Sequence, residues 1–223
     1  MTFSLLARCP SSGQLGVAVT TSDIAVGARV PYGAAGAGVA VTQHRTDPRL
    51  GPRLLARLHA GASPRDAVDA VARATEHRAW RQLGVLDASG ASAAFSGELV
   101  AAHVAALAGD GCLALGNMLV DEHVAAAIVA AFAATPGPLA VRLLAGLSAG
   151  EQAGGESGRL RSAALLIVGE AEFPLVDLRV DDDEMPLSAL ASLWRAYEPH
   201  AEFIMARALD PDAAGHGPSS TTT

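Results

Sequence analysis

Short runs of apolar residues, separated by polar or glycine-containing turns, dominate the N-terminal part of the chain. The runs at 3–7, 16–21 and 38–42 place apolar or small residues on both faces, which is typical of strands in a sheet that is covered on both sides. The run at 25–30 ends before Pro31 and is predicted to be extended as well. The glycine-rich stretch 33–38 predicts a tight turn between strands rather than a phosphate-binding loop.

Apolar residues three and four positions apart then indicate helices. Leu54, Leu55 and Leu58 predict a helix over 51–60, and Ser63-Pro64 predicts a helix start, because serine caps a helix and proline suits its first turn. The rest of the chain follows the same two patterns. We expect strands at 82–87, 91–95, 111–115, 162–168 and 175–180, and helices at 67–74, 124–134, 139–149 and about 186–208.

The predicted elements are grouped rather than strictly alternating. Several strands precede two helices, further strands precede two more helices, and two strands precede the last helix. Because a βαβ alternation is absent, this order favours an α+β fold of two packed sheets covered by helices. The 223 residues suit one domain, which we assign to 1–208, and the segment 209–223, rich in Pro, Gly, Ser and Thr, predicts a disordered tail.

Composition narrows the function classes. The net charge is −7, the arginines are scattered, and aromatic residues are only 4%, which argues against nucleic-acid binding. Cys9 and Cys112 lack metal-ligand spacing; one disulfide is an open alternative, but two buried thiols in a reducing cytosol are favoured. Because the N-terminus lacks a signal-peptide pattern and no apolar run reaches membrane-spanning length, we expect a cytoplasmic protein without membrane contact.

The second residue suggests nucleophilic chemistry. Removal of Met1, which a small second residue such as Thr2 permits, would leave Thr2 as the first residue of a strand. Its hydroxyl and its own α-amine, with a pKa of ~7.7–8, then form a nucleophile with a built-in general base. An ordinary N-terminal strand is the simpler alternative, because Met-Thr starts are common.

Other polar residues give weaker signals. Asn117 follows an apolar strand and Gly116, where its amide could donate to an oxyanion or cap a turn, and both alternatives stay open. The histidines are expected mostly on surfaces of helices and loops. The acidic run 181–184 is interpreted as a solvated turn in preference to a cation site. Strong metal and nucleotide motifs are missing, so no metal and no cofactor are predicted.

A set of short segments matches, in order, segments of a known protein family, and their joint order is specific although each segment is short. The segments are 1–4, 16–19, 25–28 with 30–31, 42–43 with Pro48 and 51–53, 81–85, 116–119, 142–144, 149–150, 154–155, 162–165 and 176–181. On these segments the chain resembles the bacterial domain of unknown function 1028 family, which belongs with the N-terminal-nucleophile (Ntn) hydrolases. The resemblance covers about 1–197 and implies a four-layer αββα sandwich.

The resemblance also implies site residues. Thr2 would be the nucleophile, Thr21 a neighbouring hydroxyl, and Asn117 the preferred oxyanion donor. Gln43, Arg81, Gln82 and Glu156 are placed with substrate binding, with no chemical role assigned to Arg81 and Gln82. The chain departs from the family pattern at Asp47 and Leu50 and across the loop 156–161.

Two hypotheses of different classes follow. The first is an amidohydrolase that cleaves an amide bond in a small-molecule substrate through an acyl-enzyme on Thr2. The second is a catalytically degenerate member of the Ntn fold that binds a ligand or partner, and it rests on the altered loop 156–161. An unrelated oligomeric scaffold is the weakest alternative. A homodimer through the apolar faces of the alanine-rich helices is predicted, although such faces also form cores.

Overall fold

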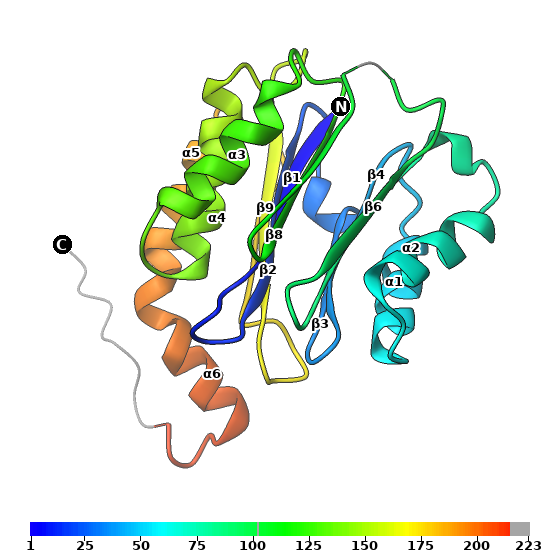
Figure 1. Cartoon of the computed structure of the whole chain (residues 1–223). Coiled ribbons are helices and arrows are strands. Elements are labelled where there is room, and N and C mark those ends of the chain that lie inside the picture. The colour runs from blue at the N-terminus through cyan, green and yellow to red at the C-terminus, as the bar shows by residue number, and fades with distance from the viewer. Residues whose placement is uncertain (102, 215–223) are drawn as a thin grey trace.

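The computed structural model describes residues 1–101 and 103–214. Its strands form two antiparallel sheets, one of six strands and one of four (Figure 1). The six-stranded sheet has the spatial order β10 (Val176–Val180), β9 (Ser162–Val168), β2 (Leu15–Thr21), β1 (Thr2–Arg8), β8 (Cys112–Asn117) and β7 (Ala105–Gly109). The four-stranded sheet has the order β3 (Pro31–Ala34), β4 (Gly38–His44), β5 (Arg81–Asp87) and β6 (Ser92–Ser96).

Helices cover the outer face of each sheet (Figure 1). The six-stranded sheet carries α3 (His123–Ala134), α4 (Leu139–Gln152) and α5 (Pro186–Tyr197), and the four-stranded sheet carries α1 (Leu50–His59) and α2 (Pro64–Arg73). The chain also forms α6 (Ala201–Leu209) and the short 3-10 helices η1 (Val26–Ala28), η2 (Arg78–Trp80) and η3 (Glu198–His200). The predicted α+β class is therefore confirmed.

Three groups of buried side chains hold these elements together. Phe3, Ile128 and Leu143 represent the core between the six-stranded sheet and its helices. Val17, Val41 and Leu115 pack between the two sheets, and Leu54, Val68 and Val85 pack between the four-stranded sheet and α1 and α2. Both central sheets are thus buried on their two faces, as the continuous apolar runs of the sequence predict. The dimer expected through the alanine-rich helices stays a prediction.

The start of α2 agrees with the expected cap. The Ser63 hydroxyl accepts a hydrogen bond from the Asp66 amide at 3.1 Å, and Pro64 occupies the first turn.

The structure also bears on the cysteines and on the expectation about membranes. Cys9 and Cys112 are both buried and free. Within the described ranges, every helix is too short or too polar to cross a membrane.

The segment 25–30 corrects one prediction, because it is not a strand. Ala25 has a left-handed φ of 53° and begins the 3-10 helix η1. The backbone amide of Ala25 donates to the Asp181 carbonyl at 2.8 Å, and that of Val26 donates to the Ser162 hydroxyl at 3.1 Å. These amides therefore bind groups outside any sheet ladder, and the apolar side chains of Val26 and Val30 enter the core between the sheets.

Two further boundaries differ from the sequence expectation. The last helix is not continuous over 186–208, since Pro199 interrupts it and separates α5 from α6 through η3. Strand β7 was not expected, because four of its five residues are alanine or glycine and the segment shows no alternation of apolar and polar positions. Of the predicted tail 209–223, Leu209 is the last residue of α6 and 210–214 form a turn, while 215–223 lie outside the described residues.

Candidate functional site

Polar residues replace apolar ones at one end of the layer between the sheets. Side chains alternate between the faces of a strand, so every second residue points into this layer. Along β1, β2, β4, β5 and β8 the inward positions are apolar in the middle and then become polar. The polar inward residues are Thr2 and Ser4 on β1, Thr21 on β2, Gln43 on β4, Gln82 on β5 and Asn117 on β8.

Thr2 and Thr21 form a hydroxyl pair at this polar end. Their Oγ1 atoms lie 3.2 Å apart, and both hydroxyls reach the backbone carbonyl oxygen of Met1. Thr2 is 5% exposed and Thr21 is 2% exposed. Thr2 lies directly opposite Asn117 in the β1–β8 ladder, so the chain start, a second hydroxyl and an amide converge.

A cavity of about 320 Å³ opens next to the hydroxyl pair. Its lining includes Thr2, Thr21 and Arg81 of the predicted site residues, together with His44 and Arg45 from the end of β4. Gln43, Gln82, Asn117 and Glu156 are not among its lining residues. The structure thus brings three of the seven predicted site residues to the cavity wall, and the other four are buried behind or beside it.

Buried amides form a hydrogen-bonded network behind the cavity. Gln82 Oε1 accepts from Gln43 Nε2 at 2.7 Å and from Asn117 Nδ2 at 2.9 Å. Gln82 Nε2 donates to the Gly116 carbonyl at 2.9 Å, and the Ser4 hydroxyl donates to Gln43 Oε1 at 3.0 Å. Because a backbone carbonyl can only accept, it fixes the orientation of the Gln82 amide and through it those of Gln43 and Asn117.

This orientation determines what Asn117 offers. One of its two amide hydrogens is donated to Gln82, and its Oδ1 is buried without a hydrogen-bond partner. The second amide hydrogen is therefore the group that Asn117 would use as an oxyanion donor. The side-chain oxygen Oδ1 of Asn117 can accept one more hydrogen bond. A donor for it would be the α-amine of Thr2, which lies opposite Asn117 on β1 and which removal of Met1 would release.

Glu156 is a buried carboxyl group beside the chain start. Leu119 and Glu156 form an isolated antiparallel bridge just beyond the end of β8. Glu156 is 5% exposed, and neither carboxylate oxygen makes a hydrogen bond of good geometry. Burial raises its pKa to about 7, while the nearby N-terminal ammonium and Ser22 oppose the shift. The carboxyl thus titrates in the same range as an α-amine.

The raised pKa predicts a pH-dependent stability. The folded-state pKa of Glu156 exceeds its ordinary value of 4.5. The contribution of this carboxyl to the free energy of unfolding is therefore fully present below pH about 4.5 and is lost as pH rises through about 7. A shift of this size corresponds to about 3 kcal/mol of unfolding free energy. We expect Glu156→Gln to remove most of this pH dependence in urea unfolding measured from pH 4.5 to 8.5.

Glu151→Gln, which alters an exposed carboxylate on α4, is the matched control and should leave the pH profile as it is in the parent protein. A Glu156→Gln profile that keeps the parent slope would contradict the assignment of the pH dependence to this carboxyl.

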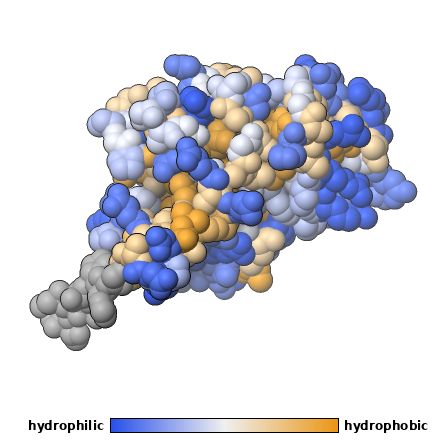
Figure 2. Space-filling model, turned by 90° about the horizontal axis from the view of Figure 1, so that it is seen from below, coloured by the Kyte–Doolittle hydropathy of each residue, from blue (hydrophilic) through white to orange (hydrophobic). Residues whose placement is uncertain are grey.

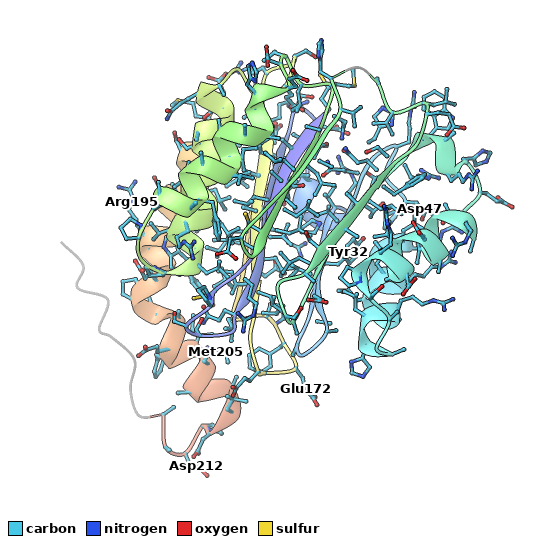
Figure 3. The ribbon with its side chains drawn as sticks, in the orientation of Figure 1. Tyr32, Asp47, Glu172, Arg195, Met205 and Asp212 are labelled. Carbon is cyan, nitrogen blue, oxygen red and sulfur yellow. The ribbon has the colours of Figure 1, made fainter. Side chains whose placement is uncertain are left out.

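Asp47 organises the arginines at the edge of the cavity. Arg49 Nε and Nη2 donate to its two carboxylate oxygens at 2.9 and 2.7 Å, and Arg81 Nη2 lies 3.9 Å from Oδ2. The hydrogen bonds from Arg49, with the charge of Arg81 adding to them, lower the pKa of Asp47 to about 2 despite burial. Figure 3 shows where Asp47 and Tyr32 lie near α1. Burial, and then the negative charge of Asp47, raise the pKa of the Tyr32 hydroxyl.

His44 and Arg45 are cavity residues that sequence reasoning missed. A histidine outside a motif was expected on a surface, but His44 is half-buried at the end of β4 and stacks on Trp80 with ring centroids 6.1 Å apart. Its φ of 68° turns the chain at this point. Their position in the sequence, directly after Gln43, could have revealed them. Residues that follow Gln43 lie at the same end of the sheet as its inward-pointing side chain.

The acidic run 181–184 is engaged in ion pairs. Arg161 Nη2 lies 2.8 Å from Asp182 Oδ2, and Arg159 Nη2 lies 3.2 Å from Glu184 Oε2. Across residues 1–101 and 103–214, no three His, Cys, Asp or Glu side chains converge in a way that could hold a metal ion. These carboxylates therefore act as partners of the arginines in the loop that departs from the family pattern.

An apolar hollow lies at the opposite end of the molecule. Seen from below, Figure 2 shows hydrophobic surface in a depression between hydrophilic margins. A cavity of about 390 Å³ there is lined by Leu139, Ile167, Leu175 and Trp194, with Met205 of α6 beside it, labelled in Figure 3. Its described lining residues include the carboxylates of Glu198 and Glu202 but no arginine, lysine, histidine, serine, threonine or cysteine. The cavity at Thr2, which brings two hydroxyls and arginines together, is therefore the stronger candidate for chemistry.

The fold and the site together define a mixed α+β protein whose first strand begins with a hydroxyl residue at a basic cavity. The model of the family of unknown function DUF1028 matches residues 2–190. Protein SPO2555 from Silicibacter pomeroyi, whose crystal structure carries the same family name, is 35% identical, with a TM-score of 0.83 over 88% of each chain. The chain therefore belongs to the DUF1028 family.

A more distant solved structure is also similar. Anbu (ancestral beta-subunit) from Yersinia bercovieri has 10% sequence identity and a TM-score of 0.45, with 93% of this chain and 97% of that chain covered. A search of curated proteins gave no match.

Proposed function

We propose that this protein is an amidohydrolase of the N-terminal-nucleophile type, with Thr2 as the nucleophile after removal of Met1. The observation that carries the proposal is the position of Thr2. It is the first residue of a central strand, and its hydroxyl lines a cavity of about 320 Å³, a volume in the range of small-molecule sites.

The arrangement of the sheets supports the same proposal. Two facing antiparallel sheets with helices on their outer faces match the αββα sandwich that the sequence resemblance implies. We infer that the four layers are those of the Ntn type, because the N-terminal strand begins at the polar edge of the layer between the sheets. Thr2, Thr21, Gln43 and Asn117 occupy that edge here.

The proposed reaction uses groups on one residue. The α-amine of Thr2 removes the proton from its hydroxyl as Oγ1 attacks the amide carbonyl carbon, and a tetrahedral oxyanion forms. The amine then returns the proton to the leaving nitrogen, the carbon–nitrogen bond breaks, and an ester on Thr2 remains. Water, deprotonated by the same amine, attacks the ester, and the carboxylic acid leaves as Oγ1 regains a proton.

Neighbouring residues would position and stabilise these steps. The second amide hydrogen of Asn117 would donate to the oxyanion, and preorganised donors of this kind contribute about 100-fold or more to rate. Thr21 Oγ1, 3.2 Å from the nucleophile, would hold the Thr2 hydroxyl in place. Gln43 and Gln82 orient Asn117 through the amide network rather than through contact with substrate.

Intact mass spectrometry of the untagged protein tests the proposal most directly. We expect the mass of the chain without Met1 and, after treatment with a β-lactone probe that acylates reactive hydroxyls, a single adduct on Thr2. The Thr2→Ala variant should lose the adduct, and Thr135→Ala, a threonine that follows α3 outside the cavity, should keep it.

The opposite result favours the second hypothesis. Retained Met1 without an adduct would leave the amine blocked and point to a protein of this fold that binds a ligand or partner without catalysis. Two contacts make this alternative specific: the Ser157 hydroxyl lies 2.9 Å from Met1 Sδ, and the Thr2 and Thr21 hydroxyls both reach the Met1 carbonyl.

A further inference from the structure

The cavity at Thr2 carries an excess of positive charge. Three arginines line it, Arg29, Arg45 and Arg81, against one carboxylate, Asp23. Arg29 Nη2 pairs with Asp23 Oδ2 at 3.0 Å, and its Nη1 donates to two backbone carbonyls. Asp23 and Arg29 therefore neutralise each other, and the charges of Arg45 and Arg81 remain.

Arg81 is only partly compensated. Its side chain is 14% exposed, and its nearest carboxylate, Asp47, lies 3.9 Å from Nη2. That carboxylate already accepts two shorter hydrogen bonds from Arg49. Arg81 Nη1 donates to the Arg45 carbonyl, and Nε is buried without a partner. A largely buried guanidinium with so few acceptors is costly unless another anion offsets it.

Arg45 lies next to Arg81 and has no ion pair among the residues that the structure describes. Its guanidinium carbon lies 5.1 Å from the centroid of the Trp80 ring, and such stacking leaves the N–H edges free to donate. A second hollow of about 370 Å³, lined also by His77 and Trp80, shares both arginines. The unpaired Arg45 and the partly compensated Arg81 thus lie where the Thr2 cavity meets this hollow.

His44 is engaged by two backbone groups. Its Nδ1 lies 2.9 Å from the Trp80 carbonyl, and its Nε2 lies 3.4 Å from the Ala101 amide. The tautomer with its hydrogen on Nδ1 fits both contacts, because Nδ1 then donates to the carbonyl and Nε2 accepts from the amide.

We propose that the substrate of this site is an amide that also carries a carboxylate, which Arg45 and Arg81 bind while the scissile carbonyl faces Thr2. This inference rests on the proposed hydrolase function for the position of the amide. The carboxylate site rests on the arginines alone. Arginine presents a planar fork of donors that matches a carboxylate, and an acid would complete the charge balance of the cavity.

Ligand binding without turnover tests the inference. The Thr2→Ala protein is titrated, by thermal shift and calorimetry, with acids and their neutral amides in matched pairs: succinate and succinamide, glutarate and glutaramide, and N-acetylglutamate and its diamide. We expect at least one acid to bind about tenfold more tightly than its amide partner, with an affinity that falls as salt rises. Arg45→Gln, at an exposed position, should weaken that acid about tenfold.

Arg57→Gln, an exposed arginine on α1 outside the cavity, is the control and should leave the affinity unchanged. Equal affinity for acids and amides, no binding by any acid, or tighter binding of inorganic phosphate than of every acid would overturn the proposal. An acid preference without turnover in the parent protein would keep the carboxylate site and remove the hydrolase. Turnover of neutral amides without an acid preference would keep the hydrolase and remove the carboxylate site.

Discussion

Replacing Thr2 by alanine is expected to abolish amide hydrolysis, with a loss of about a thousandfold or more in kcat/KM. The substitution removes the only atom that forms the acyl-enzyme bond, and the hydroxyl of Thr21, 3.2 Å away, lacks an α-amine on the same residue. To measure this, small amides are first screened for a substrate of the parent protein, and turnover of the best one is then quantified by chromatography of the released acid. Thr2→Ser should keep part of the activity, because hydroxyl and amine both survive.

The fold should tolerate Thr2→Ala. The side chain contributes one buried hydroxyl, so the expected cost is about 1 kcal/mol of unfolding free energy, and the circular dichroism spectrum should match that of the parent. Stability loss therefore cannot account for lost turnover. Full activity in the folded Thr2→Ala protein would contradict the assignment of Thr2 as the nucleophile. Retention of activity in a protein that still carries Met1 would also do so, since the amide nitrogen of Thr2 cannot act as a base.

Part of the polar site edge could be predicted from the sequence. The expected strands 16–21 and 38–42 place Thr21 and Gln43 at or just beyond strand ends, but it was the resemblance to a family that identified these two residues as candidates for the site. Neither route could supply the pairing of Gln43 with Gln82 and of Gln82 with Asn117, because these contacts join different strands and both sheets.

The remaining differences have local physical causes. The segment 25–30 has strand-like composition, but its amides are satisfied by a serine hydroxyl and a distant carbonyl, which no periodicity encodes. Arg45 was overlooked because a lone arginine has no motif, and its value depends on the absence of a carboxylate partner in space. Glu156 entered the prediction as part of an altered loop, whereas its burial beside the chain start depends on a bridge to Leu119.

Gln82→Leu is expected to give the largest loss of stability. The change preserves the approximate volume of the side chain but removes its five hydrogen-bond contacts, to Gln43, Asn117, Ser96 and two backbone carbonyls. All three amide side chains are fully buried, so water cannot replace the lost partners. Each orphaned group costs about 1–3 kcal/mol, and we expect a total of about 3–5 kcal/mol in urea unfolding monitored by circular dichroism.

Gln82→Glu separates the hydrogen-bond explanation from a packing one. Its Oε1 can still accept from Gln43 and Asn117, but the other oxygen replaces a donor and faces the Gly116 carbonyl. Only a protonated carboxyl can donate there, so its folded-state pKa should be raised, and stability should return as pH falls. Gln152→Leu, at an exposed site on α4, should stay within about 0.5 kcal/mol. If Gln82→Leu cost no more than this control, the amide network would not hold the polar ends of the two sheets together, and the fixed orientation of Asn117 behind the nucleophile would lose its structural basis.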